Sequence, residues 1–196
     1  MNAAPNNMDH PNFEILPQQK IAKAFLQLNI RNFTDACRLI GAWPYARNSN
    51  KNSLLAMFDE QCGTCSTKHA LLKELANEHN FSDLQLMLGI FKMNDKNIPK
   101  IKGILKTYQL AYLPEAHCYL KYKNQLLDYT NTNAQPIQFL DDLLVETEIQ
   151  PAEIGAKKVE FHKNYLQQWL LKNPKLPYDL PTIWHIREQC IQALSQ

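Results

Sequence analysis

Residues 115–130, EAHCYLKYKNQLLDYT, constrain the fold most, because their pattern commits the chain to an antiparallel sheet. Side chains alternate along the first half with the period of a β-strand. One face would carry Ala116, Cys118 and Leu120, and the other His117, Tyr119 and Lys121. Lys123–Gln125 has the composition of a tight turn, and the following LLDYT is typical of a return strand. We therefore expect a β-hairpin here.

Helical and extended patterns are separated along the rest of the chain. Helical spacing of apolar residues predicts helices in QQKIAKAFLQL, in NFTDACRLIGAW with Thr34 as N-cap, in LLAMFDEQ, and after Thr64. A buried strand is predicted over 85–95, and the C-terminal third is expected to be mostly helical. This segregation predicts the α+β class and argues against a doubly wound sheet.

The domain organisation follows from the same patterns. Residues 1–16 lack periodicity and are expected to form a flexible tail. Residues 17–196 are expected to form a single domain, whose sequence motifs lie over about 50–131 and whose C-terminal helical part covers about 158–195.

Composition excludes several classes of function. The net charge is +2 without a Lys/Arg cluster, which argues against nucleic acid and against a charged membrane surface. No apolar run approaches the roughly 18 residues that cross a bilayer, and the N-terminus lacks a signal-peptide pattern. We therefore expect a cytoplasmic protein without membrane contact, whose five cysteines are thiols and not a disulfide framework.

The stretch QCGTCSTKHALLKELANEHN places Cys62 and Cys65 at the start of a predicted helix, with Thr64 as a candidate N-cap. Redox chemistry is one interpretation, because C-x-x-C at a helix start is the spacing of dithiol oxidoreductases. However, AMFDEQ before it is a poor strand, and no downstream proline completes such a fold.

A metal site is a second interpretation of the same stretch. Cys62, Cys65, His69 and His79 could be drawn as a zinc ligand set, but the two histidines stand almost three helical turns apart, and no second C-x-x-C follows. Hence no metal and no organic cofactor is expected. His69 and His79 are expected to be surface or packing residues of the helix.

A cysteine nucleophile is the third interpretation. First-turn amides and the helix dipole would favour a thiolate at Cys65. His117 on the predicted strand is the candidate base, and Asp128 on the return strand is the candidate group that orients it. A hairpin would bring Asp128 back beside His117, because paired strands place facing residues about 5 Å apart.

GTCSTKHALLKEL resembles the cysteine motif of the transglutaminase-like superfamily, which belongs to the wider papain-like fold. The matching positions are Gly63, Cys65, Lys68, Leu71 and Leu72. The segment HCYLKYKNQLLDYT resembles the second motif of that family and supplies His117, Asp128 and Thr130. The resemblance covers roughly residues 50–131. His69, Tyr119 and Tyr129 depart from the common pattern, which leaves the substrate class open.

The resemblance implies a cysteine-bearing helix packed on a small antiparallel sheet, with flanking terminal helices. It also implies cysteine acyl chemistry on a peptide, protein or small amide substrate: hydrolysis, deamidation or transamidation by a Cys65–His117–Asp128 triad. Asn48, Asn50 and Trp43 are weaker candidates for contact with the substrate or the oxyanion. A non-catalytic binding module of the same fold and a dithiol oxidoreductase stay open as alternatives.

Overall fold

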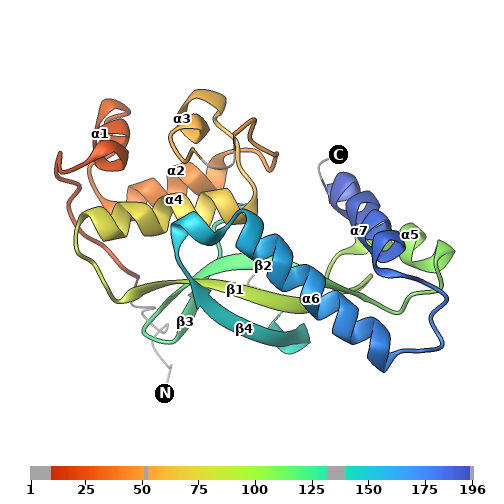
Figure 1. The fold of residues 1–196 in the computed structure, drawn as a ribbon. Helices are drawn as coiled ribbons and strands as arrows, with labels where there is room; N and C mark the ends of the chain where they lie inside the picture. Colours follow the sequence, from red (N-terminus) through yellow and green to blue (C-terminus); the bar gives the residue numbers. More distant parts are fainter. Residues whose placement is uncertain (1–9, 51–52, 132–139, 195–196) are drawn as a thin grey trace, which may run out of the picture.

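The computed structural model describes residues 10–50, 53–131 and 140–194, and Figure 1 shows their course. These residues form seven α-helices and one four-stranded antiparallel sheet of order β3-β2-β1-β4, so the expected α+β class is confirmed. The helices are α1 (Lys20–Gln27), α2 (Phe33–Ala42), α3 (Ala56–Glu60), α4 (Cys65–Glu78), α5 (Lys102–Thr107), α6 (Ala156–Lys172) and α7 (Leu180–Leu194). The strands are β1 (Leu84–Met93), β2 (Leu113–Tyr122), β3 (Gln125–Leu127) and β4 (Leu143–Ile149).

The predicted hairpin is confirmed as β2 and β3. Its loop consists of Lys123 and Asn124, whose φ angles of 48° and 62° are left-handed, as a two-residue type I′ turn requires. Gln125, expected in the turn, is already the first residue of β3 and pairs with Tyr122. Strand β3 is shorter than the expected return strand and ends at Leu127, so within the described ranges no strand pairs with the rest of β2 on that side.

Helix α4 packs on one face of the sheet. Helices α1 and α2 pack against the side of α4 that faces away from the sheet (Figure 1). The sheet face beneath it includes Ala116, Cys118 and Leu120, the alternation that the sequence predicts. Because α4 is enclosed on several sides, its polar side chains are buried as well, and Lys68 and His69 are both 0% exposed. Burial of such groups requires hydrogen-bond partners, which the site provides.

The C-terminal third contains a strand that the sequence analysis missed. Strand β4 pairs with β1 from Leu86↔Ile149 to Phe91↔Leu143 and forms one edge of the sheet. Its sequence LLVETEI carries charged residues that suit an exposed edge. The expected C-terminal helices are confirmed as α6 and α7.

Helices α6 and α7 are fixed to the start of β2 by buried polar contacts. Glu115 accepts two hydrogen bonds from Arg187 of α7, at 2.9 and 2.6 Å. His162 of α6 bonds the carbonyl oxygen of Pro114 at 2.8 Å. A second apolar cluster, which includes Tyr119, Leu166, Trp169 and Ile183, packs the same helices against the strands. The beginning of α6 is thereby held near the beginning of α4.

The N-terminal expectations need two corrections. Part of residues 10–16, expected in the tail, is packed on the domain: Ile15 is 3% exposed, and Phe13 stacks on Phe33 with ring centroids 4.8 Å apart. The apolar Phe13 and Ile15 fill space beside α2, which the absence of periodicity did not reveal. Residues 1–9 lie outside the described part. The N-cap of α2 is Asn32 and not Thr34, because the Asn32 side chain accepts from the Asp35 N–H.

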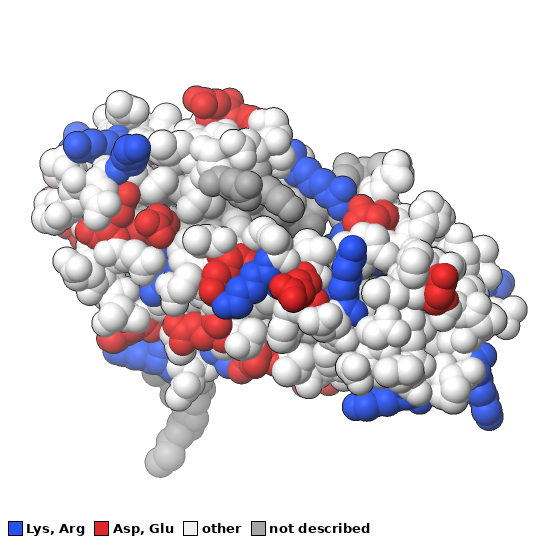
Figure 2. All heavy atoms as spheres, in the orientation of Figure 1, with Lys and Arg blue, Asp and Glu red and all other residues white. Residues whose placement is uncertain are grey.

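The surface mixes charges of both signs. On the face shown in Figure 2, basic and acidic side chains lie among one another. Among the described residues, no helix has the length and apolar character needed to cross a membrane.

Candidate functional site

Cys65 is the first residue of α4, as expected, and its side chain points into the protein with 6% exposure. Thr64 is the N-cap and forms a capping box with Thr67, so the helix start is closely defined. Gly63 lets the chain before the helix pack closely against Met57, because an added Cβ would lie 2.7 Å from the Met57 side chain. The thiol therefore lies where free first-turn amides and the helix dipole favour a negative charge.

His117 and Asp128 are joined by a hydrogen bond of 2.8 Å between Nε2 and Oδ2. The expected proximity is confirmed, but its route differs from strand pairing. Continuation of the β2–β3 register would place Asp128 opposite Tyr119, whereas the chain leaves the sheet after Leu127 and the carboxylate turns back to His117. The other carboxylate oxygen accepts from the backbone N–H and the hydroxyl of Thr130, at 2.8 and 2.5 Å.

Cys65 and His117 are in hydrogen-bonding contact, and their charges reinforce each other. Burial raises the pKa of Cys65, but the positive charges of Lys158 and His117 outweigh it and lower that pKa to about 6. Burial lowers the pKa of His117, whereas Asp128 and the Cys65 thiolate raise it well above its usual value. The favoured state at neutral pH is a thiolate–imidazolium pair. Because Asp128 occupies Nε2, Nδ1 is the ring nitrogen left for the sulfur.

The backbone of β2 contributes a further donor to Cys65. In a two-residue hairpin, the residues that flank the loop form a hydrogen-bonded pair, so Tyr122, Leu120 and Cys118 direct their N–H groups toward the β3 side. Strand β3 ends opposite Leu120, and the N–H of Cys118 instead bonds the sulfur of Cys65, which lowers its pKa further. The short β3 therefore exposes the edge of β2 to the nucleophile.

Lys158 is a site residue that the sequence analysis missed. It lies in the first turn of α6, and its Nζ is 2.6 Å from the hydroxyl of Ser66 and 3.9 Å from Sγ of Cys65. Burial lowers the pKa of Lys158, but the negative charges of Cys65 and Glu115 help to raise it above its usual value. Lys158 is therefore a stable cation beside the thiolate.

His69, expected to be a surface or packing residue, is buried within the site. Its Nε2 accepts from the N–H of Tyr129 at 2.7 Å, so Nδ1 must be protonated and donates to the carbonyl oxygen of Cys65 at 2.7 Å. Burial lowers the pKa of His69 to about 4 and keeps the ring neutral. This neutral ring ties the first turn of α4 to the segment that carries Asp128.

Lys68, part of the family-like motif, has a comparable connecting role. Its ammonium donates to the carbonyl oxygens of Trp43 and Thr130, at 2.5 and 2.7 Å. Burial lowers its pKa to about 8. Lys68 thus connects the start of α4 to two other segments, the one before α3 at Trp43 and the one after Asp128 at Thr130.

The three weaker candidates lie in or near the loop that precedes α3. Asn48 donates through Nδ2 to Glu60 and to the carbonyl oxygen of Cys62, both at 2.9 Å, and accepts from Thr67. Trp43 is buried in the core with its ring edge-on to Phe58. Asn50 is exposed, and its carbonyl oxygen accepts from the Ser53 N–H. These contacts position the loop, and a role in oxyanion binding stays a prediction.

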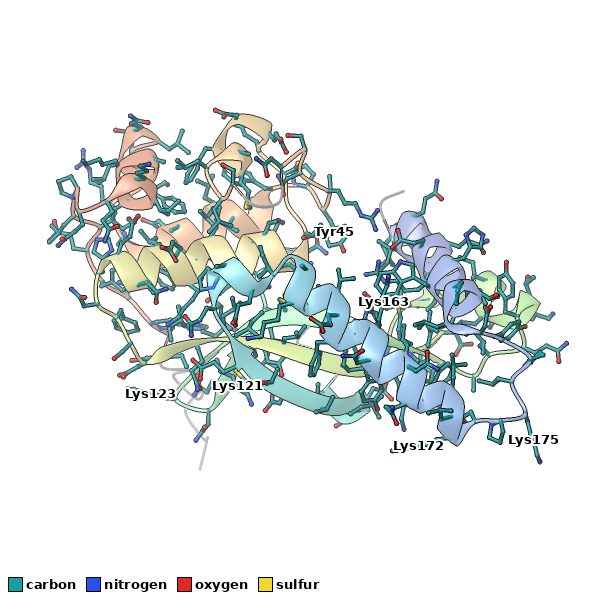
Figure 3. The ribbon with its side chains drawn as sticks, in the orientation of Figure 1. Tyr45, Lys121, Lys123, Lys163, Lys172 and Lys175 are labelled. Atoms are coloured by element: carbon teal, nitrogen blue, oxygen red, sulfur yellow. The ribbon has the colours of Figure 1, made fainter. Side chains whose placement is uncertain are left out.

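A cavity of about 340 Å³ lies beside the first turn of α4. Thr64 and Ser66 line it at the start of α4, Lys158 and His162 line it from α6, and Trp184 and Arg187 line it from α7. Tyr45, labelled in Figure 3, precedes the loop on this side and bridges to Gly63. Burial and the nearby Cys65 and Glu115 charges raise the pKa of Tyr45, so its hydroxyl keeps the proton. Cys65 does not line the cavity itself, but Ser66 and Lys158, which both lie beside its sulfur, do.

The remaining members of the C-x-x-C and metal interpretations are dispersed. Burial and the Glu60 charge raise the pKa of Cys62, opposite to the shift at Cys65. His79 bonds the carbonyl oxygen of Leu75 and the N–H of Leu16, away from both cysteines. Within the described ranges, no three His, Cys, Asp or Glu side chains are grouped as metal ligands would be. Comparison with protein-family models, with curated proteins and with solved structures finds no match for this chain.

Proposed function

We propose that this protein performs cysteine acyl chemistry on carboxamides or peptides, with Cys65 as nucleophile, His117 as general acid and base, and Asp128 as its partner. The arrangement fits the transglutaminase-like, papain-like class that the sequence resembles. The observation that carries the proposal is the chain of contacts from Cys65 to His117 to Asp128, at the first turn of a helix. The pKa of about 6 for Cys65 supports it.

The proposed reaction begins with the thiolate–imidazolium pair. The sulfur of Cys65 attacks the carbonyl carbon, a carbon–sulfur bond forms, and the carbonyl π electrons move to oxygen. The oxyanion then collapses, the carbon–nitrogen bond breaks, and His117 gives its proton to the leaving amine. Water or an amine then attacks the thioester while His117 accepts its proton, and Cys65 departs as thiolate.

Asp128 and His69 would act by holding the geometry of this pair. Asp128 accepts from Nε2 of His117, which fixes the ring orientation and favours the imidazolium. His69 bonds both the Cys65 carbonyl and the Tyr129 N–H, so it fixes the distance between the nucleophile Cys65 and the segment that carries Asp128. Free thiols at all five cysteines suit the reducing cytoplasm expected from the sequence.

Reaction with p-nitrophenyl acetate tests the proposal, because this activated ester acylates a competent thiolate without requiring the natural substrate. We expect release of nitrophenolate with a thioester on Cys65, loss of the reaction in Cys65→Ala, and a large decrease in His117→Ala. Cys62→Ser is the matched control and should react normally.

Two outcomes would replace the proposal. An unreactive Cys65 in the folded wild type would favour the non-catalytic binding module. Reactivity that needs Cys62 but not His117, together with a Cys62–Cys65 disulfide, would favour the dithiol oxidoreductase.

A further inference from the structure

We propose that Lys158 is a fourth catalytic residue, whose ammonium group binds the thiolate before attack and the carbonyl oxyanion after it. This inference rests on the proposed function and adds an oxyanion-binding residue that comes from the C-terminal helices, outside the motif region.

Both the backbone and the ammonium group of Lys158 are held in place by contacts. Its backbone lies in the first turn of α6, a helix that His162 and the second apolar cluster hold against β2. Its Nζ donates to Ser66 at 2.6 Å, and Ser66 directly follows the nucleophile. An ammonium has three N–H donors, of which Ser66 takes one and the sulfur, at 3.9 Å, attracts another.

The movement of charge during attack stays within reach of this ammonium. When the sulfur bonds the carbonyl carbon, its negative charge passes to an oxygen attached to that same carbon. Lys158 and Ser66 line the cavity through which a substrate would approach, whereas Cys118, whose N–H bonds the sulfur, is 0% exposed. Lys158 and Ser66 are therefore donors that lie both on the cavity and beside the sulfur.

The surrounding charges leave Lys158 to the reacting atoms. The groups whose ionised forms would act on it are Cys65, Glu115 and, at high pH only, Cys118, and Arg187 is the nearby cation. Glu115 already accepts two bonds from Arg187. Burial raises the pKa of the Cys118 thiol, which keeps that group neutral. The Cys65 thiolate is therefore the remaining counter-ion of Lys158. Its negative charge moves to the oxyanion during attack and is lost from the site when the oxyanion collapses to the neutral thioester.

The test separates thiolate stabilisation from oxyanion stabilisation by comparing two reactions of Cys65. Alkylation by iodoacetamide needs the thiolate but forms no oxyanion, whereas acylation by p-nitrophenyl acetate needs both. Full pH–rate profiles are measured for wild type, Lys158→Gln and Lys157→Gln, and the high-pH plateaus are compared, where each thiol is ionised. Lys157 is a matched control, because it is exposed and pairs with Glu153.

For Lys158→Gln we expect a higher alkylation midpoint with an undiminished plateau, and an acylation plateau lowered by about 100- to 1000-fold, the range for loss of an oxyanion donor. Circular dichroism and a urea-unfolding midpoint equal to those of the wild type show that the variant is still folded. Equal plateaus in both reactions would overturn the oxyanion role and leave Cys65 as nucleophile. Absence of acylation in the wild type would overturn the proposed function together with this inference.

Discussion

Replacement of His117 by alanine should raise the pKa of Cys65, so that its alkylation becomes slower at low pH and faster at high pH. The structure sets the size of the effect. Burial raises the pKa of Cys65, and His117 is one of the two cations that lower it from 9.0 to about 6. In the limiting case the variant returns to 9.0. At pH 5.5 the ionised fraction would then fall from roughly one quarter to about three parts in ten thousand, given the one-proton titration of each thiol.

Nucleophilicity partly offsets this loss. A thiolate of higher pKa reacts faster by about 0.4–0.5 log units per pKa unit, or roughly 20-fold for this change. The alkylation rate of His117→Ala should therefore fall roughly 40-fold at pH 5.5 and exceed that of the wild type by roughly 20-fold above pH 10. The two profiles should cross between about pH 7 and 8, as the same two factors require.

Stopped-flow alkylation with iodoacetamide in a Cys62→Ser background measures these profiles for Cys65. His185→Ala is the matched control, because His185 is an exposed residue of α7 that contacts Gln189. An unshifted midpoint near pH 6 in His117→Ala would refute the thiolate–imidazolium pair, and Lys158 alone would then account for the acidic thiol.

Three further changes probe the supports of the site. Asp128→Asn removes the charge that raises the pKa of His117, so acylation by p-nitrophenyl acetate should fall by about 100-fold or more, with unchanged circular dichroism; near-normal rates would contradict the role of Asp128. His69 has a folded pKa of about 4, below its ordinary 6.5, so the unfolded state binds its proton first as pH falls. Urea unfolding should therefore show a loss of up to about 3 kcal/mol between pH 6.5 and 4 that is absent in His69→Gln, and equal pH dependence would be contrary evidence. Gly63→Ala should lower the free energy of unfolding by about 1–3 kcal/mol, because the new methyl would lie 2.7 Å from Met57; Gly103→Ala in α5, with no atom within 4 Å, should be neutral or stabilising, and equal effects would refute the packing argument.

The parts of the site that the sequence predicts are those set by local rules. Thr64 caps the helix that begins at Cys65, and the Lys123–Asn124 turn folds the chain back after His117. Alternation along β2 places Ala116, Cys118 and Leu120 in the core beneath α4. Each of these depends on neighbours within about ten residues, which pattern reasoning covers.

The parts that it misses depend on contacts between distant segments. Lys158 stands in a charged, amphipathic segment that gives no sign of Ser66, its partner in space. His69 looks like any helical histidine until α4 is enclosed and Tyr129 is brought beside it. Its position four residues after Cys65 was the available signal, because that spacing places both on one helix face. Strand β4 was missed because its charged residues resemble a solvated segment, and only pairing with β1 reveals it.

The central claim is that Cys65 is a thiolate at neutral pH, and the ultraviolet absorbance of the thiolate tests it without a substrate. The absorbance of the wild type is titrated against pH, and that of Cys65→Ala is subtracted to remove the other thiols and the tyrosines. The account predicts a step of one thiolate centred near pH 6. A difference spectrum that stays flat until the thiol's ordinary pKa of 9.0 would contradict it.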